Sequence, residues 1–182
     1  MRGKYIVISG PSGVGKGTIC KRLVEELGLK VSTSMTTRDM REGEVDGIDY
    51  YFTNKEDFEK RIKNNEFIEY ATYNDNYYGT LKKEVEDKLN AGLNVICEIE
   101  VQGAMQIKKL FANSLLIYIL PPSFEELRNR LINRNTDDIE TIEKRIDIAK
   151  KEKEYIDEYD YVVINDDIDE AVNKIIDIIK NK

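Results

Sequence analysis

Residues 10–17 read Gly-Pro-Ser-Gly-Val-Gly-Lys-Gly and stand between a β-branched run at 6–8 and a segment with helical periodicity. A strand, a glycine-rich loop and a helix in this order form the usual setting for phosphate binding by backbone N–H groups. The glycines permit the turn without Cβ clashes, and the helix adds the positive end of its dipole. Lys16 adds a mobile positive charge for a phosphate oxygen. The stretch therefore predicts binding of a nucleoside triphosphate, in preference to a purely structural turn.

The position after the lysine departs from most phosphate-binding loops. Gly17 stands where a Ser or Thr hydroxyl commonly holds Mg²⁺, and the hydroxyl comes one residue later, at Thr18. We therefore expect Mg²⁺ to bind through water, phosphate oxygens and other side chains. The loop is similar to that of nucleoside monophosphate kinases. The residues expected to contact ATP here are Gly10, Pro11, Ser12, Gly13, Val14, Gly15, Lys16, Gly17 and Thr18.

The composition limits the classes of function. The 182 residues are 41% hydrophobic and 35% charged, which suits one compact domain with a large core. A net charge of −7 disfavours a nucleic-acid partner, and no apolar run reaches the roughly 20 residues of a membrane helix. The first strand begins so early that we expect no signal peptide. The sequence leaves open whether the protein is a monomer or a homodimer.

Histidine is absent, which excludes histidine-based acid–base catalysis, Ser–His or Cys–His triads and ordinary zinc sites. The two cysteines, Cys20 and Cys97, lie in apolar patterns. We interpret them as small core residues and not as a redox pair. This usage favours a reducing, cytoplasmic location.

Apolar patterns of strand and helix length alternate along most of the chain. Buried strands are expected at about 4–9, 29–33, 94–98, 115–120 and 161–164. Helices are expected at about 15–27, 55–65, 81–91 and 102–111. A further helix begins at a capping box at 123–126, another ends at about 155, and the C-terminal helix begins at 168. The fold class is therefore α/β, with a three-layer parallel sheet covered by helices on both faces. Ligands are expected at the carboxyl ends of the strands.

Two segments interrupt this pattern. Residues 34–80 carry scattered glycines and many Tyr and Phe, with alternation over 67–73 that predicts a half-buried antiparallel strand. We expect a small mixed α/β insert there. The polar stretch 134–141 has no apolar stripe and is expected to be a mobile loop within a lid at about 126–141. The remaining residues, 1–33, 81–125 and 142–182, would form the core of a single domain.

The remaining motifs come in a fixed order. The insert contains Ser34-x-Thr36-Thr37-Arg38-x-x-Arg41-x-Gly43-Glu44-x-x-Gly47-x-x-Tyr50, then Phe67-Ile68-Glu69 and Asn76-Tyr77-Tyr78-Gly79-Thr80. Later come Glu98-Ile99-Glu100-Val101-Gln102-Gly103 and the pair Arg134 and Arg145. Together these motifs resemble the guanylate kinase family over essentially the full chain. The resemblance implies reversible phosphoryl transfer from ATP to GMP, and to dGMP as well, with Mg²⁺ as cofactor.

The residue chemistry agrees with this resemblance. Arg38 and Arg41, with Tyr50 and Tyr78, are able to clamp a phosphate dianion, because arginine forks match phosphate oxygens. Their alternative role is that of solvated charges. In the family these positions bind the phosphate of GMP.

Glu69 is the candidate reader of the base. Guanine presents N1–H and the 2-amino group side by side to a carboxylate, whereas adenine has an acceptor at N1 and no 2-amino group. The resemblance adds the hydroxyls of Ser34 and Thr80 as donors to guanine O6, and includes Gly79. The alternative for Glu69 is an outward residue on an alternating strand.

Glu98 and Glu100 end an apolar strand, and the resemblance implies that they help to place the metal and GMP, with Glu98 the candidate near Mg²⁺. Their alternative is a plain strand-end charge pair. The same resemblance assigns the catalytic positions and places adenine beside Asn165. The catalytic residues it implies are Lys16, Arg38, Arg134 and Arg145. After Arg134 relatives usually have Gly-Thr-Glu, whereas residues 135–137 here read Asn-Thr-Asp.

Three other functions remain to be weighed. A kinase for AMP or another monophosphate is compatible with the loop but is opposed by Glu69 and the arginine pair. A non-catalytic guanylate-kinase-like interaction module is opposed by the intact loop with Lys16. A regulatory GTPase is opposed by Gly17, which stands where the phosphate loop of such proteins carries a hydroxyl residue.

Overall fold

The computed structural model describes residues 2–73, 75–134 and 138–182, and these residues form two β-sheets. The larger sheet has five parallel strands in the order β2-β7-β1-β8-β9. Its strands are β1 (Tyr5–Ser9), β2 (Lys30–Val31), β7 (Val95–Glu98), β8 (Leu115–Leu120) and β9 (Tyr161–Ile164). The predicted α/β class with a parallel sheet is confirmed. The second strand is shorter than the predicted 29–33.

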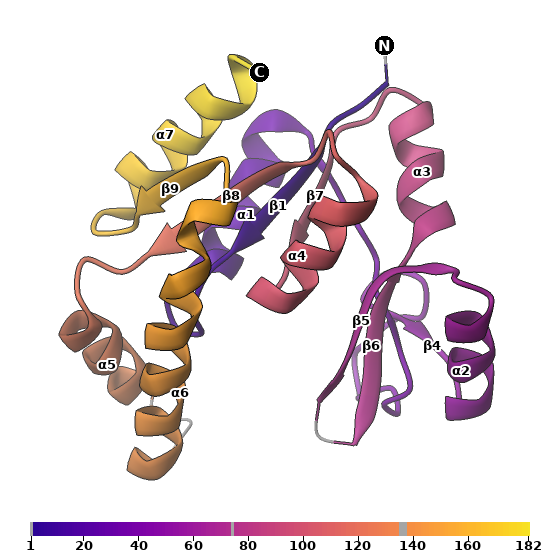
Figure 1. Cartoon of the computed structure of the whole chain (residues 1–182), viewed down its shortest axis with the longest axis horizontal. Helices are drawn as coiled ribbons and strands as arrows, with labels where there is room; N and C mark the ends of the chain where they lie inside the picture. The colour runs from indigo at the N-terminus through magenta and orange to yellow at the C-terminus, as the bar shows by residue number, and fades with distance from the viewer. Residues whose placement is uncertain (1, 74, 135–137) are drawn as a thin grey trace.

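Helices cover both faces of this sheet (Figure 1). They are α1 (Lys16–Leu27), α3 (Lys82–Asn90), α4 (Val101–Leu110), α5 (Phe124–Asn133), α6 (Ile139–Glu152) and α7 (Ile168–Lys180), with a 3₁₀ helix η1 (Lys153–Glu158) after α6. On β1, Ile6 and Ile8 pack in one buried cluster with α1 and α7, whereas Tyr5 and Val7 pack in another with α3 and α4. Every residue of β1 is buried because both faces are covered, which explains its unbroken apolar run.

The smaller sheet has mixed strands in the order β4-β3-β6-β5. Its elements are β3 (Met35–Thr36), β4 (Tyr51–Phe52), α2 (Lys55–Lys63), β5 (Phe67–Tyr73) and β6 (Asn76–Leu81). Met35, Phe58 and Phe67 form a small core there, in which the two phenyl rings stack with centroids 4.3 Å apart. We call residues 34–80 the insert. In Figure 1 the insert and the pair α5–α6 extend from the same side of the parallel sheet, one at each end.

Strand β5 is antiparallel to β6 as predicted, but its first residues do not alternate. Phe67 pairs with Leu81 and Glu69 with Thr80, so that Ile68 is an extra residue on β5. This β-bulge interrupts the two-residue period, and Phe67, Ile68 and Glu69 are all buried. Glu69 is therefore not the outward residue that strict alternation would give.

The polar stretch 134–141 is not one continuous loop, which corrects the prediction. Helix α6 begins at Ile139, and Asp138 caps it by accepting a hydrogen bond from Thr141 N at 2.7 Å. Residues 138–141 therefore form the cap and first turn of α6. Residues 135–137, including the predicted departure from the family pattern, lie outside the described residues.

Two further observations concern the whole described chain. Cys97 is buried and Cys20 is half-buried against the α1 side of the core, and both are free thiols, in agreement with their interpretation as core residues. None of the described helices has the length and apolar character needed to cross a bilayer.

Candidate functional site

The predicted phosphate loop connects the end of β1 to the start of α1. Gly10, Gly13 and Gly15 have φ values of +146°, +89° and +99°, a region that favours glycine. A Cβ at Gly10 would lie 2.4 Å from Ile119 O, so the backbone approach there requires glycine. Helix α1 begins at Lys16 without a side-chain cap. Its first N–H groups are therefore available to an outside acceptor such as a phosphate oxygen.

Lys16 folds back over this loop. Its Nζ donates to Gly10 O at 2.6 Å and to Pro11 O at 3.1 Å. Burial lowers the pKa of the ammonium group, while the carboxylates of Glu98 and Glu152 act in the opposite direction. An anionic ligand would stabilise this partly desolvated ammonium more than the neutral carbonyls do. The loop therefore favours binding of an anion.

Helix α6 meets the loop through Arg145, whose Nη1 donates to Ser12 Oγ at 2.5 Å. Arg134 lies exposed at the carboxyl end of α5. The structure thus brings one of the two predicted lid arginines to the loop. The action of both on the transferring phosphoryl group stays a prediction.

Glu98 faces the loop beside the residue that departs from the usual pattern. Its Oε2 lies 3.5 Å from the position that a Cβ at Gly17 would occupy. Carboxylate oxygen is a ligand that Mg²⁺ prefers, and glycine at position 17 leaves that oxygen open toward the loop. Among the described residues no three His, Cys, Asp or Glu side chains gather closely enough to hold a metal by themselves. The residues present fit a Mg²⁺ ion that keeps water and phosphate ligands.

Asn165 follows β9 and is buried against the loop. Its Nδ2 donates to Val14 O at 2.8 Å, and a Cβ at Gly15 would lie 2.6 Å from that Nδ2. Asn165 therefore supports the loop backbone, a role that the sequence pattern did not indicate. Its predicted contact with adenine stays a prediction, as does a nucleotide contact of Thr18, which is exposed on the first turn of α1.

A cleft of about 510 Å³ opens where the insert meets the carboxyl end of β7. Most of the predicted acceptor residues line it. These are Ser34, Tyr50, Glu69, Tyr78, Gly79, Thr80, Glu98 and Glu100. The remaining two, Arg38 and Arg41, are not part of the lining.

Glu69 is the buried charge of this cleft, with 6% of its surface exposed. Its Oε1 accepts a hydrogen bond from Thr80 Oγ1 at 2.7 Å, and Ser34 Oγ lies 3.4 Å from the same hydroxyl. Burial raises the pKa of the Glu69 carboxyl, and the hydrogen bonds from Thr80 partly offset that rise. A ligand that brings hydrogen-bond donors would stabilise the ionised form of this buried carboxyl.

Two glycines allow the surrounding elements to approach Glu69. A Cβ at Gly79 would lie 2.9 Å from Glu69 O, so glycine lets β6 run close to β5. A Cβ at Gly103 would lie 3.4 Å from Glu69 Oε2 and 2.3 Å from Ile99 Cδ1. The first turn of α4 therefore packs against the carboxylate because residue 103 has no side chain.

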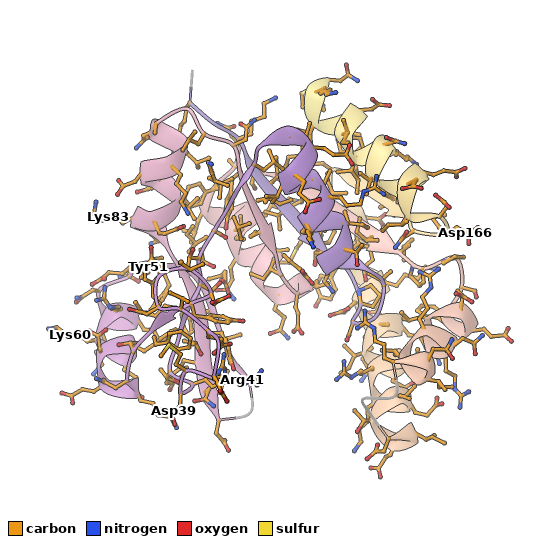
Figure 2. The ribbon with its side chains drawn as sticks, turned by 180° about the vertical axis from the view of Figure 1, so that it is seen from behind. Asp39, Arg41, Tyr51, Lys60, Lys83 and Asp166 are labelled. Atoms are coloured by element: carbon orange, nitrogen blue, oxygen red, sulfur yellow. The ribbon has the colours of Figure 1, made fainter. Side chains whose placement is uncertain are left out.

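Arg38 and Arg41 are joined by a carboxylate. Arg38 Nη2 bonds Glu44 Oε1 at 2.7 Å, and Arg41 N donates to Glu44 Oε2 at 2.8 Å. The Arg38 guanidinium also lies 5.6 Å from the ring centroid of Tyr50. Figure 2 shows Arg41 on the side of the insert that faces α5 and α6, opposite to Lys60. Local contacts within the insert therefore hold the Arg38 side chain and the backbone at Arg41, and their grip on a phosphate stays a prediction.

Two carboxylates near the site were not among the predicted residues. Glu44 was quoted within a motif, but its bridge between the arginines depends on the turn at 42–47. Glu152 is half-buried at the end of α6, where burial and Glu100 raise its pKa and Lys16 lowers it. Its spacing of seven residues from Arg145 places both on one face of α6, a signal that was available in the sequence.

The parallel sheet with its glycine loop defines a phosphate-loop α/β protein. The family model described as guanylate kinase matches residues 2–182. The chain belongs to the guanylate kinase family.

Individual relatives agree with this assignment. The chain is 50% identical over all of its 182 residues to a protein named guanylate kinase from Oceanobacillus iheyensis, of which it covers 88%. Among solved structures, it is similar to a crystal structure of guanylate kinase from Anaplasma phagocytophilum, with a TM-score of 0.76 and 35% identity. That match covers 99% of this chain and 86% of the other.

A more distant match extends the likeness of fold alone. A crystal structure of an uncharacterized protein from Eubacterium ventriosum has a TM-score of 0.56 at 18% identity. It covers 98% of this chain and 99% of the other.

Proposed function

We propose that the protein is a guanylate kinase that transfers a phosphoryl group from ATP to GMP, and to dGMP, in a reversible reaction that forms GDP or dGDP. The observation that carries this proposal is the buried carboxylate of Glu69 in a cleft beside an intact phosphate loop. Membership of the guanylate kinase family supports the same reaction. The free, largely buried thiols of Cys20 and Cys97 support a cytoplasmic location.

At the donor end, the backbone N–H groups of residues 13–18 and the ammonium group of Lys16 hold the ATP phosphates. Glu98, with water and phosphate oxygens, would hold Mg²⁺, which when bound supplies neutralisation of phosphate charge. Arg145 approaches the same phosphates from α6, which already contacts the loop at Ser12. Arg134 joins it from the end of α5.

At the acceptor end, Arg38 and Arg41 grip the phosphate of GMP together with the hydroxyls of Tyr50 and Tyr78. Arg38 and Arg41 are not part of the lining, but the Arg38 guanidinium lies 5.6 Å from the ring centroid of Tyr50, which is, so in our proposal a small movement brings it to the phosphate. Arg38 also stabilises charge that develops during the transfer.

The base is read deeper in the cleft. Glu69 accepts hydrogen bonds from guanine N1–H and the 2-amino group while Thr80 donates to its Oε1, and the Ser34 hydroxyl supplies a donor near O6. Gly79 allows the close approach of strands at this point. Glu100 contacts the bound nucleotide from the opposite wall of the cleft.

The reaction needs alignment and exclusion of water more than it needs a base, because the attacking phosphate oxygen is already anionic. In our proposal the insert, residues 34–80, and a lid at about 126–141 close over a core of 1–33, 81–125 and 142–182. Such closure occurs in roughly microseconds to milliseconds. It brings the acceptor phosphate into line with the donor.

A coupled assay of ADP formation tests the proposal, with GMP, AMP, dTMP or no acceptor added to ATP and Mg²⁺. We expect GMP to be preferred by about 100-fold or more, since a buried site with the wrong base leaves polar groups unpaired. A preference for AMP would refute the proposal that Glu69 recognises guanine. Absence of turnover with every acceptor would instead favour a non-catalytic interaction module.

A further inference from the structure

The floor of the acceptor cleft contains two buried hydroxyl groups that the proposed reaction has not used. Ser32 lines the cleft and is 7% exposed, and Tyr5, which is 2% exposed, lies beneath it. Within the described residues, no hydrogen bond of ordinary geometry reaches Ser32 Oγ or Tyr5 OH, although the two hydroxyls lie close enough to interact with each other. Buried hydroxyls are normally paired with protein groups or ordered water, so a Ser32 hydroxyl without a firm protein partner is available to a ligand that enters the cleft.

The backbone fixes the position of Ser32. Its N–H donates to Ile96 O at 3.0 Å, and the next residue, Thr33, donates its N–H to Glu84 Oε1 at 3.2 Å. Because both neighbouring peptide groups are held by the core, the Ser32 side chain stays at the floor of the cleft. Its hydroxyl is a preorganised group of the kind that contributes to specificity.

The other polar groups of the cleft do not account for every hydrogen-bonding atom of guanine. Thr80 Oγ1 already donates to Glu69 Oε1, and Ser34 Oγ lies beside Thr80. Glu69 itself, as a carboxylate, only accepts hydrogen bonds. The ring nitrogens N7 and N3 of guanine are acceptors and require a donor that these groups do not supply.

Tyr5 completes the arrangement. Burial raises the pKa of its phenol well above the ordinary value, so the group stays neutral and keeps its proton. Its hydroxyl lies next to Ser32 and Cys97. Tyr5 therefore keeps a proton that it is able to donate to Ser32 Oγ, and in that arrangement the proton of Ser32 is left for the ligand.

We propose that Ser32 is a further specificity-determining residue, whose hydroxyl donates a hydrogen bond to a purine ring nitrogen, N7 or N3, of the acceptor nucleotide. The inference rests on the proposed function, because it needs a guanine in this cleft. It adds a hydrogen-bond donor to a cleft in which the Glu69 carboxylate only accepts.

Ser32→Ala tests the inference by steady-state kinetics. We expect the KM for GMP to rise about tenfold, with kcat and the KM for ATP within about twofold of wild type, since one neutral hydrogen bond is lost. Ser114→Ala is the matched control. Ser114 Oγ is also buried without a partner in the described chain, but it lies by the amino ends of the strands, at a different pocket.

Nucleotide analogues locate the bond without altering the fold. We expect 7-deaza-GMP or 3-deaza-GMP to raise the KM of wild type by about tenfold but to have no further effect in Ser32→Ala. A KM for GMP unchanged in Ser32→Ala would overturn the inference while the proposed function stands. Fully additive losses with both analogues would also overturn it. Failure of wild type to phosphorylate GMP would overturn the proposed function and this inference together.

Discussion

The phosphate loop and the acceptor cleft are built in different ways. The loop consists of consecutive residues, and its proposed binding groups are backbone N–H groups whose directions depend on glycine φ values. The cleft takes its side chains from β5, β6, the end of β7 and the start of α4, segments far apart in the sequence. A local motif therefore specifies the donor end by itself. The acceptor end exists only when the insert has folded against the parallel sheet.

The two ends also use burial with opposite signs of charge. Burial lowers the pKa of Lys16 and raises the pKa of Glu69, so each charged form is disfavoured in the free protein. A bound phosphate would stabilise the charged form of Lys16, and the hydrogen-bond donors of guanine would stabilise the charged form of Glu69. Both groups therefore lower the stability of the free protein slightly and favour ligand binding. Substitutions at each end test this conclusion.

The largest expected effect is at the donor end. Lys16→Ala should lower kcat by about 10²–10³-fold, because a preorganised charge at the phosphates is lost. Its Nζ bonds only neutral loop carbonyls, so the melting temperature should stay close to that of wild type. Coupled ADP assays and thermal unfolding measure the two quantities.

Lys21→Ala is the control for that substitution, since Lys21 is exposed on the same helix. It should leave kcat unchanged. A Lys16→Ala enzyme with the kcat of wild type would show that Lys16 does not take part in phosphoryl transfer.

A smaller effect is expected at the phosphate clamp of the acceptor end. Glu44→Gln should raise the KM for GMP about fivefold with little change in kcat, because Arg38 loses the charged partner that orients it. Glu42→Gln, at an exposed neighbouring carboxylate, should have no effect. A lower KM in Glu44→Gln would mean that Glu44 competes with the nucleotide phosphate and does not position Arg38.

The smallest effect is on stability. The pKa of Glu69 is raised in the folded chain, so between the ordinary carboxyl pKa and the raised one the folded state holds more protons than the unfolded state. Stability therefore falls as pH rises through that window and stays lower above it. Glu69→Gln lacks this charge and should melt about 2–4 °C higher near neutral pH, the shift of about 1 kcal/mol in a domain of this size.

Thermal unfolding in acid completes that test. The difference in melting temperature should shrink below the ordinary carboxyl pKa, where Glu69 is protonated in both states. A destabilised Glu69→Gln at neutral pH would show that the carboxylate contributes to folding as a satisfied group.

The sequence predicted the alternating core well because the apolar periods are local and strong. The strands at 115–120 and 161–164 have the predicted bounds, since residues of each pack on both faces of the sheet, although Ile164 at the end of the second is exposed. The burial of Glu69 was not predictable from its strand, because it depends on the bulge at Ile68 and on the missing side chain at Gly103. Such long-range fits leave no local pattern.

The same reasoning explains the other differences. Asp138 was grouped with a loop because its cap of α6 involves only polar residues, which carry no apolar period. Asn165 was assigned by resemblance, whereas its bond to Val14 O arises from two loops that meet only in the fold. The contacts that support the site therefore left no signal in the sequence.

The central claim is that Glu69 distinguishes guanine through two neighbouring donors, and inosine monophosphate, which lacks the 2-amino group, tests it most directly. The measurement is kcat/KM for GMP and for inosine monophosphate, in wild type and in Glu69→Gln. We expect wild type to prefer GMP by about 100-fold and Glu69→Gln to lose most of that preference. An equal preference in both enzymes would contradict the claim that this carboxylate reads the base.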